Sequence, residues 1–113
     1  MKFAFVLALV GTTAAADTPE IVDARATQTS GGWQFDVTVA HPDTGWDHYA
    51  DGWAVEDAAG NQLGLRVLVH PHVAEQPFTR GMAITADLPD VVYIRGRCNV
   101  DGWSDERFDV TLR

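Results

Sequence analysis

All four histidines of the 113-residue chain lie in two short motifs that are also rich in acidic and aromatic residues. The first motif, from His41 to Trp53, reads HPDTGWDHYADGW, and the second, from His70 to Arg80, reads HPHVAEQPFTR. Imidazole and carboxylate groups together form the ligand set that suits Zn²⁺ and Cu²⁺ in proteins. The two motifs are therefore the first place to look for a binding site.

A metal site built from both motifs would use side chains that project from one surface. Two residues that are two positions apart in an extended segment, such as His70 and His72, point to the same side. The spacing matches no closed structural-zinc signature, and the alternative is that these groups satisfy loop backbone by hydrogen bonds. The candidate ligands for copper or zinc are His41, His48, His70, His72 and Glu75.

The aromatic residues of the motifs indicate another kind of site, a surface that binds a protein partner. Aromatic side chains on convergent loops dominate many interfaces, although the same rings can form a lid over a core. We expect Arg80 to pair with a nearby acid and hold the second motif in place. The candidate contact residues are Asp43, Trp46, Asp47, His48, Tyr49, Asp51, Arg80 and Trp103.

Other chemistries find weaker support in the motifs. Asp43, Asp47 and Asp51 are four residues apart, whereas the EF-hand loop places its calcium ligands two apart. The Asp-Thr-Gly triplet at 43–45 is similar to that of aspartic proteases but lacks the hydrophobic residues that precede it there. No nucleophile signature or glycine-rich phosphate loop is found. We therefore expect a protein that is not an enzyme.

The single cysteine, Cys98, has no partner for an internal disulfide. Val92, Ile94 and Cys98 alternate along one face of a predicted strand. We therefore expect Cys98 to be a small buried apolar residue, with a ligand or redox role as the alternative.

Residues 1–16 have the layout of a secretory signal peptide. A lysine at position 2 precedes an apolar run at 3–10, and three alanines at 14–16 precede a polar stretch. The run is shorter than the roughly 20 apolar residues that a membrane-spanning helix needs. We expect cleavage after Ala16, a domain at 17–113, a periplasmic or secreted location and no membrane insertion, with an uncleaved anchor as the alternative.

Acidic residues outnumber basic ones sixteen to eight, which gives a formal net charge of −8. A negative field repels phosphate backbones and anionic lipid headgroups. Nucleic acid is thus excluded as a partner, whereas a metal ion or a protein with a basic patch is favoured. The alternative is that the acids only keep a monomeric exported protein soluble.

Short β-rich runs separated by turn residues predict an all-β domain. Trp33, Phe35, Val37 and Val39 alternate with more polar residues, which is typical of a half-buried strand. The predicted strands are 21–29, 33–40, 53–56, 62–70, 78–88, 91–98 and 107–112. Seven short strands in under a hundred residues favour a single immunoglobulin-like or fibronectin-like antiparallel β-sandwich.

Alternate connections of an antiparallel run of strands emerge at the same end of a sandwich. Both motifs and the segment 99–105 are alternate connections, whereas the intervening turns at 30–32, 58–61 and 88–90 are short. We therefore expect one elaborated end that brings together residues distant in sequence. These are His41, Asp43, Asp47, His48, His70, His72, Glu75, Asp101 and Trp103.

The pair of motifs resembles a family of small, uncharacterised exported bacterial proteins, a resemblance that covers most of the predicted mature chain and implies no activity. A looser similarity, to the end of a fibronectin type III domain, involves Leu88-Pro89, Tyr93, Asn99 and Gly102-Trp103-Ser104. Tyr93 departs from that family because it shares a strand face with arginines rather than with apolar residues. The second resemblance implies only the sandwich architecture.

Overall fold

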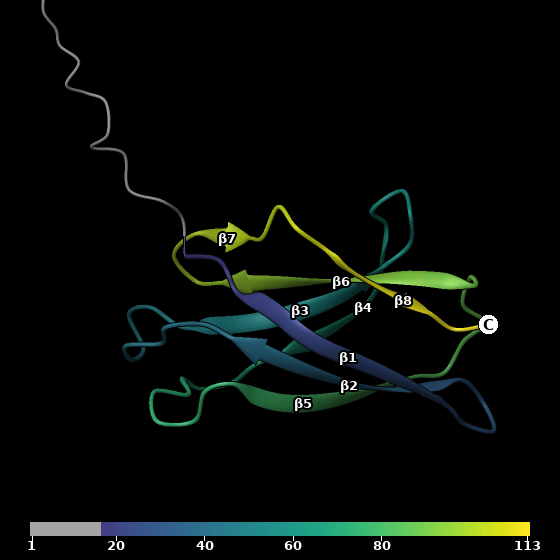
Figure 1. Ribbon diagram of the computed structural model, residues 1–113, viewed down its shortest axis with the longest axis horizontal. Helices are drawn as coiled ribbons and strands as arrows, with labels where there is room; N and C mark the ends of the chain where they lie inside the picture. The colour runs from purple at the N-terminus through teal and green to yellow at the C-terminus, as the bar shows by residue number, and fades with distance from the viewer. Residues whose placement is uncertain (1–16) are drawn as a thin grey trace, which may run out of the picture.

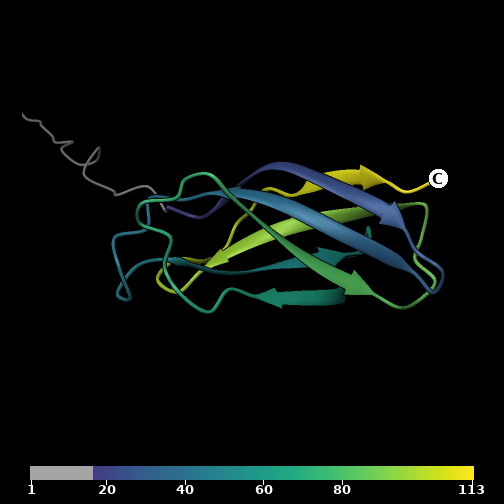
Figure 2. The ribbon, with the colours of Figure 1, turned by 90° about the horizontal axis from the view of Figure 1, so that it is seen from below.

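The computed structural model describes residues 17–113, which fold into two antiparallel sheets packed face to face (Figures 1 and 2). The first sheet has the order β1-β2-β5 and consists of β1 (Glu20–Gln28), β2 (Trp33–Ala40) and β5 (Phe78–Ile84). The second has the order β4-β3-β6-β7, and β8 also pairs with β6. Its strands are β3 (Ala50–Glu56), β4 (Gln62–Val67), β6 (Val91–Cys98), β7 (Gly102–Trp103) and β8 (Phe108–Thr111). The predicted all-β sandwich is confirmed.

The predicted leader at 1–16 lies outside the described residues. Within residues 17–113, the structure has no helix of the length and apolar character needed to cross a membrane.

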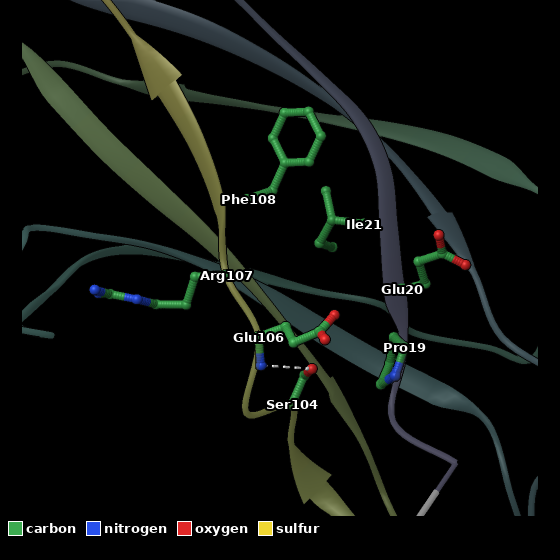
Figure 3. A pocket seen from close by; sticks show the side chains of 7 residues that line it. All are labelled: Pro19, Glu20, Ile21, Ser104, Glu106, Arg107 and Phe108. Atoms are coloured by element: carbon green, nitrogen blue, oxygen red, sulfur yellow. Dashed lines mark hydrogen bonds between the residues drawn. The ribbon is translucent and has the colours of Figure 1, made fainter.

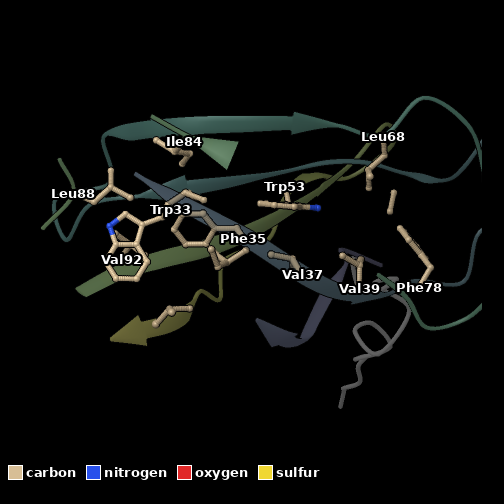
Figure 4. Close-up of a cluster of buried hydrophobic side chains, with 14 residues drawn as sticks. Trp33, Phe35, Val37, Val39, Trp53, Leu68, Phe78, Ile84, Leu88 and Val92 are labelled. Carbon is tan, nitrogen blue, oxygen red and sulfur yellow. The ribbon is translucent and has the colours of Figure 1, made fainter. Parts of the chain in front are cut away.

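The alternating pattern of β2 produces the core of the sandwich (Figure 4). Its four large apolar side chains, from Trp33 to Val39, are buried, and the polar residues between them are partly exposed. They pack against Trp53 of β3 and Phe78 of β5, both fully enclosed. A period of two therefore sorts the strand into a core face and an outer face.

β6 shows the same alternation, with the arginines outside. Cys98 is buried, as expected, whereas Tyr93 lies on the outer face with Arg95 and Arg97. The outer face has its own polar network, because Arg95 and Arg107 both donate to Oε1 of Glu56 at 3.2 Å. The departure of Tyr93 from the fibronectin pattern is therefore a real feature of the fold.

Strand boundaries differ from the prediction where the chain enters and leaves the elaborated end. β3 begins three residues early, because Ala50 pairs with Cys98 of β6. β4 ends at Val67 rather than 70, because Leu68 turns to donate its amide to the carbonyl of Asp51. β5 ends at 84 rather than 88, and the segment 99–105 contains β7, which pairs with the end of β6.

Three connections gather at one end of the sandwich, and the C-terminus lies at the opposite end (Figures 1 and 2). They are β2–β3 (41–49), β4–β5 (68–77) and β6–β7 (99–101), hereafter the loop end. The first two cross from one sheet to the other, so the strands are not a simple series of hairpins. All pairs are antiparallel, however, and this parity places the connections together.

Phe35 tests the core of the sandwich, because its side chain is 0% exposed. We expect Phe35→Ala to lower the free energy of unfolding by about 3–5 kcal/mol, since it removes a buried aromatic ring and leaves a cavity. Urea denaturation measures the loss. Val22→Ala, at a residue that is 45% exposed, is the control and should change stability by less than about 0.5 kcal/mol. Equal effects of the two substitutions would contradict this core.

Candidate functional site

The buried carboxylate of Asp43 holds the β2–β3 connection against the β4–β5 connection at the loop end. Its Oδ1 accepts hydrogen bonds from the ring Nδ1 of His41 at 2.6 Å and from the backbone amide of Ala50 at 2.9 Å. Its Oδ2 accepts from the backbone amide of His72 at 2.8 Å, across 29 residues of sequence. Asp43, one of the candidate contact residues, is therefore buried and acts as an internal brace.

Two side-chain amides, whose roles the sequence did not indicate, complete the bracing. Gln76 accepts from the backbone amide of His41 at 3.0 Å and donates to the carbonyl of His72 at 2.9 Å. Asn99 accepts from the amide of Tyr49 at 2.9 Å and donates to the carbonyl of Trp46 at 3.1 Å. Loop amides of this kind give no pattern in a single sequence, because any surface loop contains them.

A tight turn inside the β2–β3 connection presents Trp46 to solvent. The backbone amide of Thr44 donates to the carbonyl of His48, and the amide of His48 donates to the carbonyl of Gly45, which closes the turn. Gly45 has a φ of +152°. Such a positive φ is accessible mainly to glycine. Trp46 is 67% exposed, and its ring meets Tyr49 edge to face with centroids 5.6 Å apart.

The second motif forms a separate cluster around the buried ring of His72. The ring stacks on Phe78 with centroids 3.9 Å apart, and its Nε2 accepts a hydrogen bond from Arg80 at 2.8 Å. Arg80 also contacts Glu75 at 3.2 Å, so the predicted arginine–acid pair forms, through one oxygen only. His70 is exposed, with its ring centroid 4.5 Å from that of His72.

The structure divides the five predicted metal ligands into two groups. His41 and His48 lie together, with ring centroids 4.9 Å apart. His72 already uses Nε2 on the Arg80 guanidinium, which always carries its protons and repels a cation. The predicted single shell of four histidines and Glu75 is therefore not formed. The physical reason is that the two motifs meet through Asp43 and backbone, whereas their rings pack against different neighbours.

The buried thiol at the end of β6 joins the first group instead. Single donor atoms of His41, His48 and Cys98 all lie within 4.8 Å of one another. Asp101 is beside them, with Oδ2 at 3.5 Å from Nε2 of His48 and 3.8 Å from Sγ of Cys98. Asp101 was expected at this end, whereas Cys98 was expected in the core with a ligand role as the alternative, because strand parity shows burial and not what lies beyond the strand end.

The remaining candidate residues have mixed surroundings. Asp51 pairs with Nε of Arg97 at 2.9 Å, and the Arg97 guanidinium lies 5.2 Å from the ring centroid of Trp103. These contacts tie β3 to β6 and β7. Asp47 is exposed in the turn, and its carboxylate is 3.4 Å from the hydroxyl of Thr44. Asp51 is thus chiefly structural, whereas Asp47 is free to face a partner.

Exposed apolar side chains concentrate at the loop end. Of the seven large hydrophobic residues exposed within residues 17–113, five lie in the three connections or directly after them. They are Trp46, Val69, Val73, Val100 and Trp103. Scattered exposed hydrophobics are ordinary, so it is their concentration near one end of the sandwich that sets this end apart.

A small hollow of about 140 Å³ lies between β1 and the start of β8 (Figure 3). Its lining residues are Pro19, Glu20, Ile21, Ser104, Glu106, Arg107 and Phe108. The hydroxyl of Ser104 accepts the amide of Glu106 at 3.2 Å, so it is engaged in the local turn. None of the predicted site residues lines this hollow.

These features define a β-sandwich whose specialised surface is a braced group of loops at one end. The chain is similar to a putative lipoprotein of Halomicrobium mukohataei, with 41% identity over 76 residues. The similar region covers 65% of this chain, and the chain spans about a third, 36%, of the length of that curated relative. No family model matches the sequence, and no solved structure matches it.

The brace can be tested by removing its carboxylate. We expect Asp43→Ala to cost about 3–5 kcal/mol of unfolding free energy, because it strands the buried His41 ring and two backbone donors. Denaturation measures the loss, and amide exchange followed by NMR should accelerate at Ala50 and His72. Asp47→Ala, in the exposed turn, is the matched control and should be nearly neutral. Slow exchange at His72 in the Asp43 variant would contradict the brace.

The pKa of His72 is held below its ordinary value of 6.5, first by burial and then by the charges of Arg80 and His70. Glu75 and Asp43 act in the opposite direction. The ring is therefore neutral in the folded protein at neutral pH.

The lowered pKa of His72 predicts a loss of stability in acid. Below about pH 6.5 the His72 ring binds a proton in the unfolded chain but not in the folded chain. The free energy of unfolding therefore falls as the pH falls, until the ring is protonated in the folded chain too. We expect this part of the pH dependence to disappear in His72→Gln and to persist in His70→Gln, measured by urea denaturation between about pH 5 and pH 8. An unchanged slope in His72→Gln would show that other groups cause the effect.

Proposed function

We propose that this protein is a non-catalytic accessory binding module of the cell envelope that contacts a protein partner through the loop end. The concentration of exposed apolar side chains on three braced connections carries the proposal. Buried aromatic anchors supply most of the energy at protein interfaces. Trp46, exposed at the tip of its turn, is the strongest such anchor here.

The charge of the loop end supports a partner with a basic surface. The connections 41–49, 68–77 and 99–101 contain no lysine or arginine, whereas Asp47, Glu75 and Asp101 lie on them. The whole chain carries a formal net charge of −8. Complementary charge steers the encounter, and apolar contacts then hold the complex. We therefore expect a partner that offers hydrophobic residues ringed by lysine or arginine.

Two further observations support the assignment to the envelope and to binding. The relative from Halomicrobium mukohataei carries the name putative lipoprotein, and residues 1–16 read as an export signal. The polar groups at the loop end are mostly committed to structure, since Asp43 is enclosed by three donors. Such groups fix the shape of a surface and are not available for catalysis.

Trp46 provides the test in cells. A photo-crosslinking amino acid at position 46 should capture one defined envelope protein, because this side chain would lie at the centre of the contact. The control places the same amino acid at Gln28, which is exposed at the last residue of β1, at the end of the sandwich away from the loop end. This variant should not capture the partner. Mass spectrometry of the adduct identifies the partner and separates it from a second copy of this chain.

Substitutions at the loop end should also change the affinity of the isolated complex and its rate of association. We expect Trp46→Ala to weaken the isolated complex by at least about 2 kcal/mol, or roughly 30-fold, in a binding titration. Asp47→Lys should slow association, with a smaller effect at high salt. Equal capture from positions 46 and 28, or full affinity in the Trp46 variant, would refute the proposal.

A further inference from the structure

Three potential metal ligands, two from the β2–β3 connection and one from the end of β6, meet beneath the loop end, and the proposed partner surface does not use them. His41 and His48 flank the β2–β3 turn, and Cys98 ends β6. One donor atom from each lies within 4.8 Å of the others. His41 and Cys98 are 4% and 1% exposed, so the cluster is largely enclosed.

His41 is oriented as a metal-binding histidine usually is. Metal ligands of this type donate their second ring nitrogen to a carboxylate, which fixes the ring and raises its basicity. Here Nδ1 of His41 lies 2.6 Å from Oδ1 of Asp43, whose other donors hold it rigidly. Nδ1 is thus committed to Asp43, and Nε2, which now contacts the carbonyl of Asp17, is the atom that would bind an ion.

His48 supplies an independent sign of a missing ligand. Its Nε2 is buried and, among residues 17–113, has no hydrogen-bond partner. An enclosed polar atom without a partner is costly and rare in native proteins. The nearest charged group, Oδ2 of Asp101, is 3.5 Å away. An ion between the two groups would satisfy both.

Cys98 has surroundings that suit a coordinating sulfur. The backbone amide of Asp101 donates to Sγ at 3.1 Å, and such a donor stabilises negative charge on sulfur. Thiolate with imidazole selects zinc or copper, whereas calcium and magnesium prefer oxygen ligands. The donor set therefore defines the class of ion.

We propose that His41, His48 and Cys98 bind one zinc or copper ion, with the Asp101 carboxylate as the fourth ligand. Ligand atoms around a tetrahedral ion with bonds of about 2.0–2.3 Å lie roughly 3.5–3.8 Å apart. The donors, now within 4.8 Å, would close by on the order of 1 Å. His70, His72 and Glu75 take no part.

Asp17 covers this site and would move when the ion enters. Its carbonyl oxygen lies 2.5 Å from Nε2 of His41, and its backbone nitrogen donates to Oδ2 of Asp101 at 3.1 Å. The ion would take over both contacts. Gly96 permits this position of the chain, because a Cβ there would meet Cβ of Pro19 at 2.8 Å. Metal binding would therefore release the segment that now seals the site.

The experiment is a titration of the untagged, reduced, full-length exported protein with Co²⁺, Zn²⁺ and Cu²⁺ as separate probes, without oxygen. We expect one ion per chain, a thiolate-to-metal charge-transfer band with Co²⁺ or Cu²⁺, and a rise in melting temperature. Direct competition between Zn²⁺ and Cu²⁺ for the Co²⁺-loaded protein ranks the affinities of the two ions against the order that applies to most sites. Absence of any band at one equivalent would overturn the proposal.

Variants locate the ion. Cys98→Ser should abolish the band, and Asp43→Asn should weaken binding by about 10–100-fold, as loss of an outer-shell partner does. His48→Gln should weaken metal binding at least as much. Because the His48 side chain is partly exposed, this substitution should leave the fold intact, which circular dichroism checks. His70→Ala is the control and should leave affinity within about twofold, because removing a residue outside the shell costs no ligand. A band that survives Cys98→Ser, or is lost in His70→Ala, would refute the assignment.

Discussion

The loop end depends on one buried carboxylate that accepts hydrogen bonds from three donors. Within the described part of the chain Asp43 has no arginine partner, and its charge is met by the His41 ring and by backbone amides of two separate chain segments. Buried carboxylates are tolerated only when their acceptor capacity is filled. The position of every neighbouring group follows, because the amides of Ala50 and His72 can satisfy Asp43 only if β3 and the second motif approach it together.

The fold was accessible from the sequence because strand parity is a local property. The alternation from Trp33 to Val39 indicated which face of β2 is buried, and antiparallel order indicated which connections share an end. The site was accessible only in part. Parity brought the histidines to one end, but whether the His72 ring faces a metal or Arg80 depends on rotamers and on distant neighbours such as Phe78.

The bracing residues show why the rest could not be predicted. Gln76 and Asn99 act across gaps of 35 and 50 residues, and each uses its amide as donor and acceptor at once. A single sequence shows neither which distant segments come into contact nor how the amide groups are oriented there. The approach of Cys98 to His48 could not be predicted for the same reason. The two residues are far apart in sequence and are brought together by the pairing of β3 with β6, in which Ala50 is opposite Cys98.

The double hydrogen bond from Asn99 to the Trp46 turn has a consequence for association. A loop that must order itself on binding loses conformational entropy, which reduces affinity. The turn here is closed by its own backbone, fixed from outside by Asn99, and flanked by the Tyr49 ring. Its indole is therefore preorganised, and substitutions that remove apolar contacts of this surface should act on the dissociation rate, whereas only changes of charge should act on the rate of encounter.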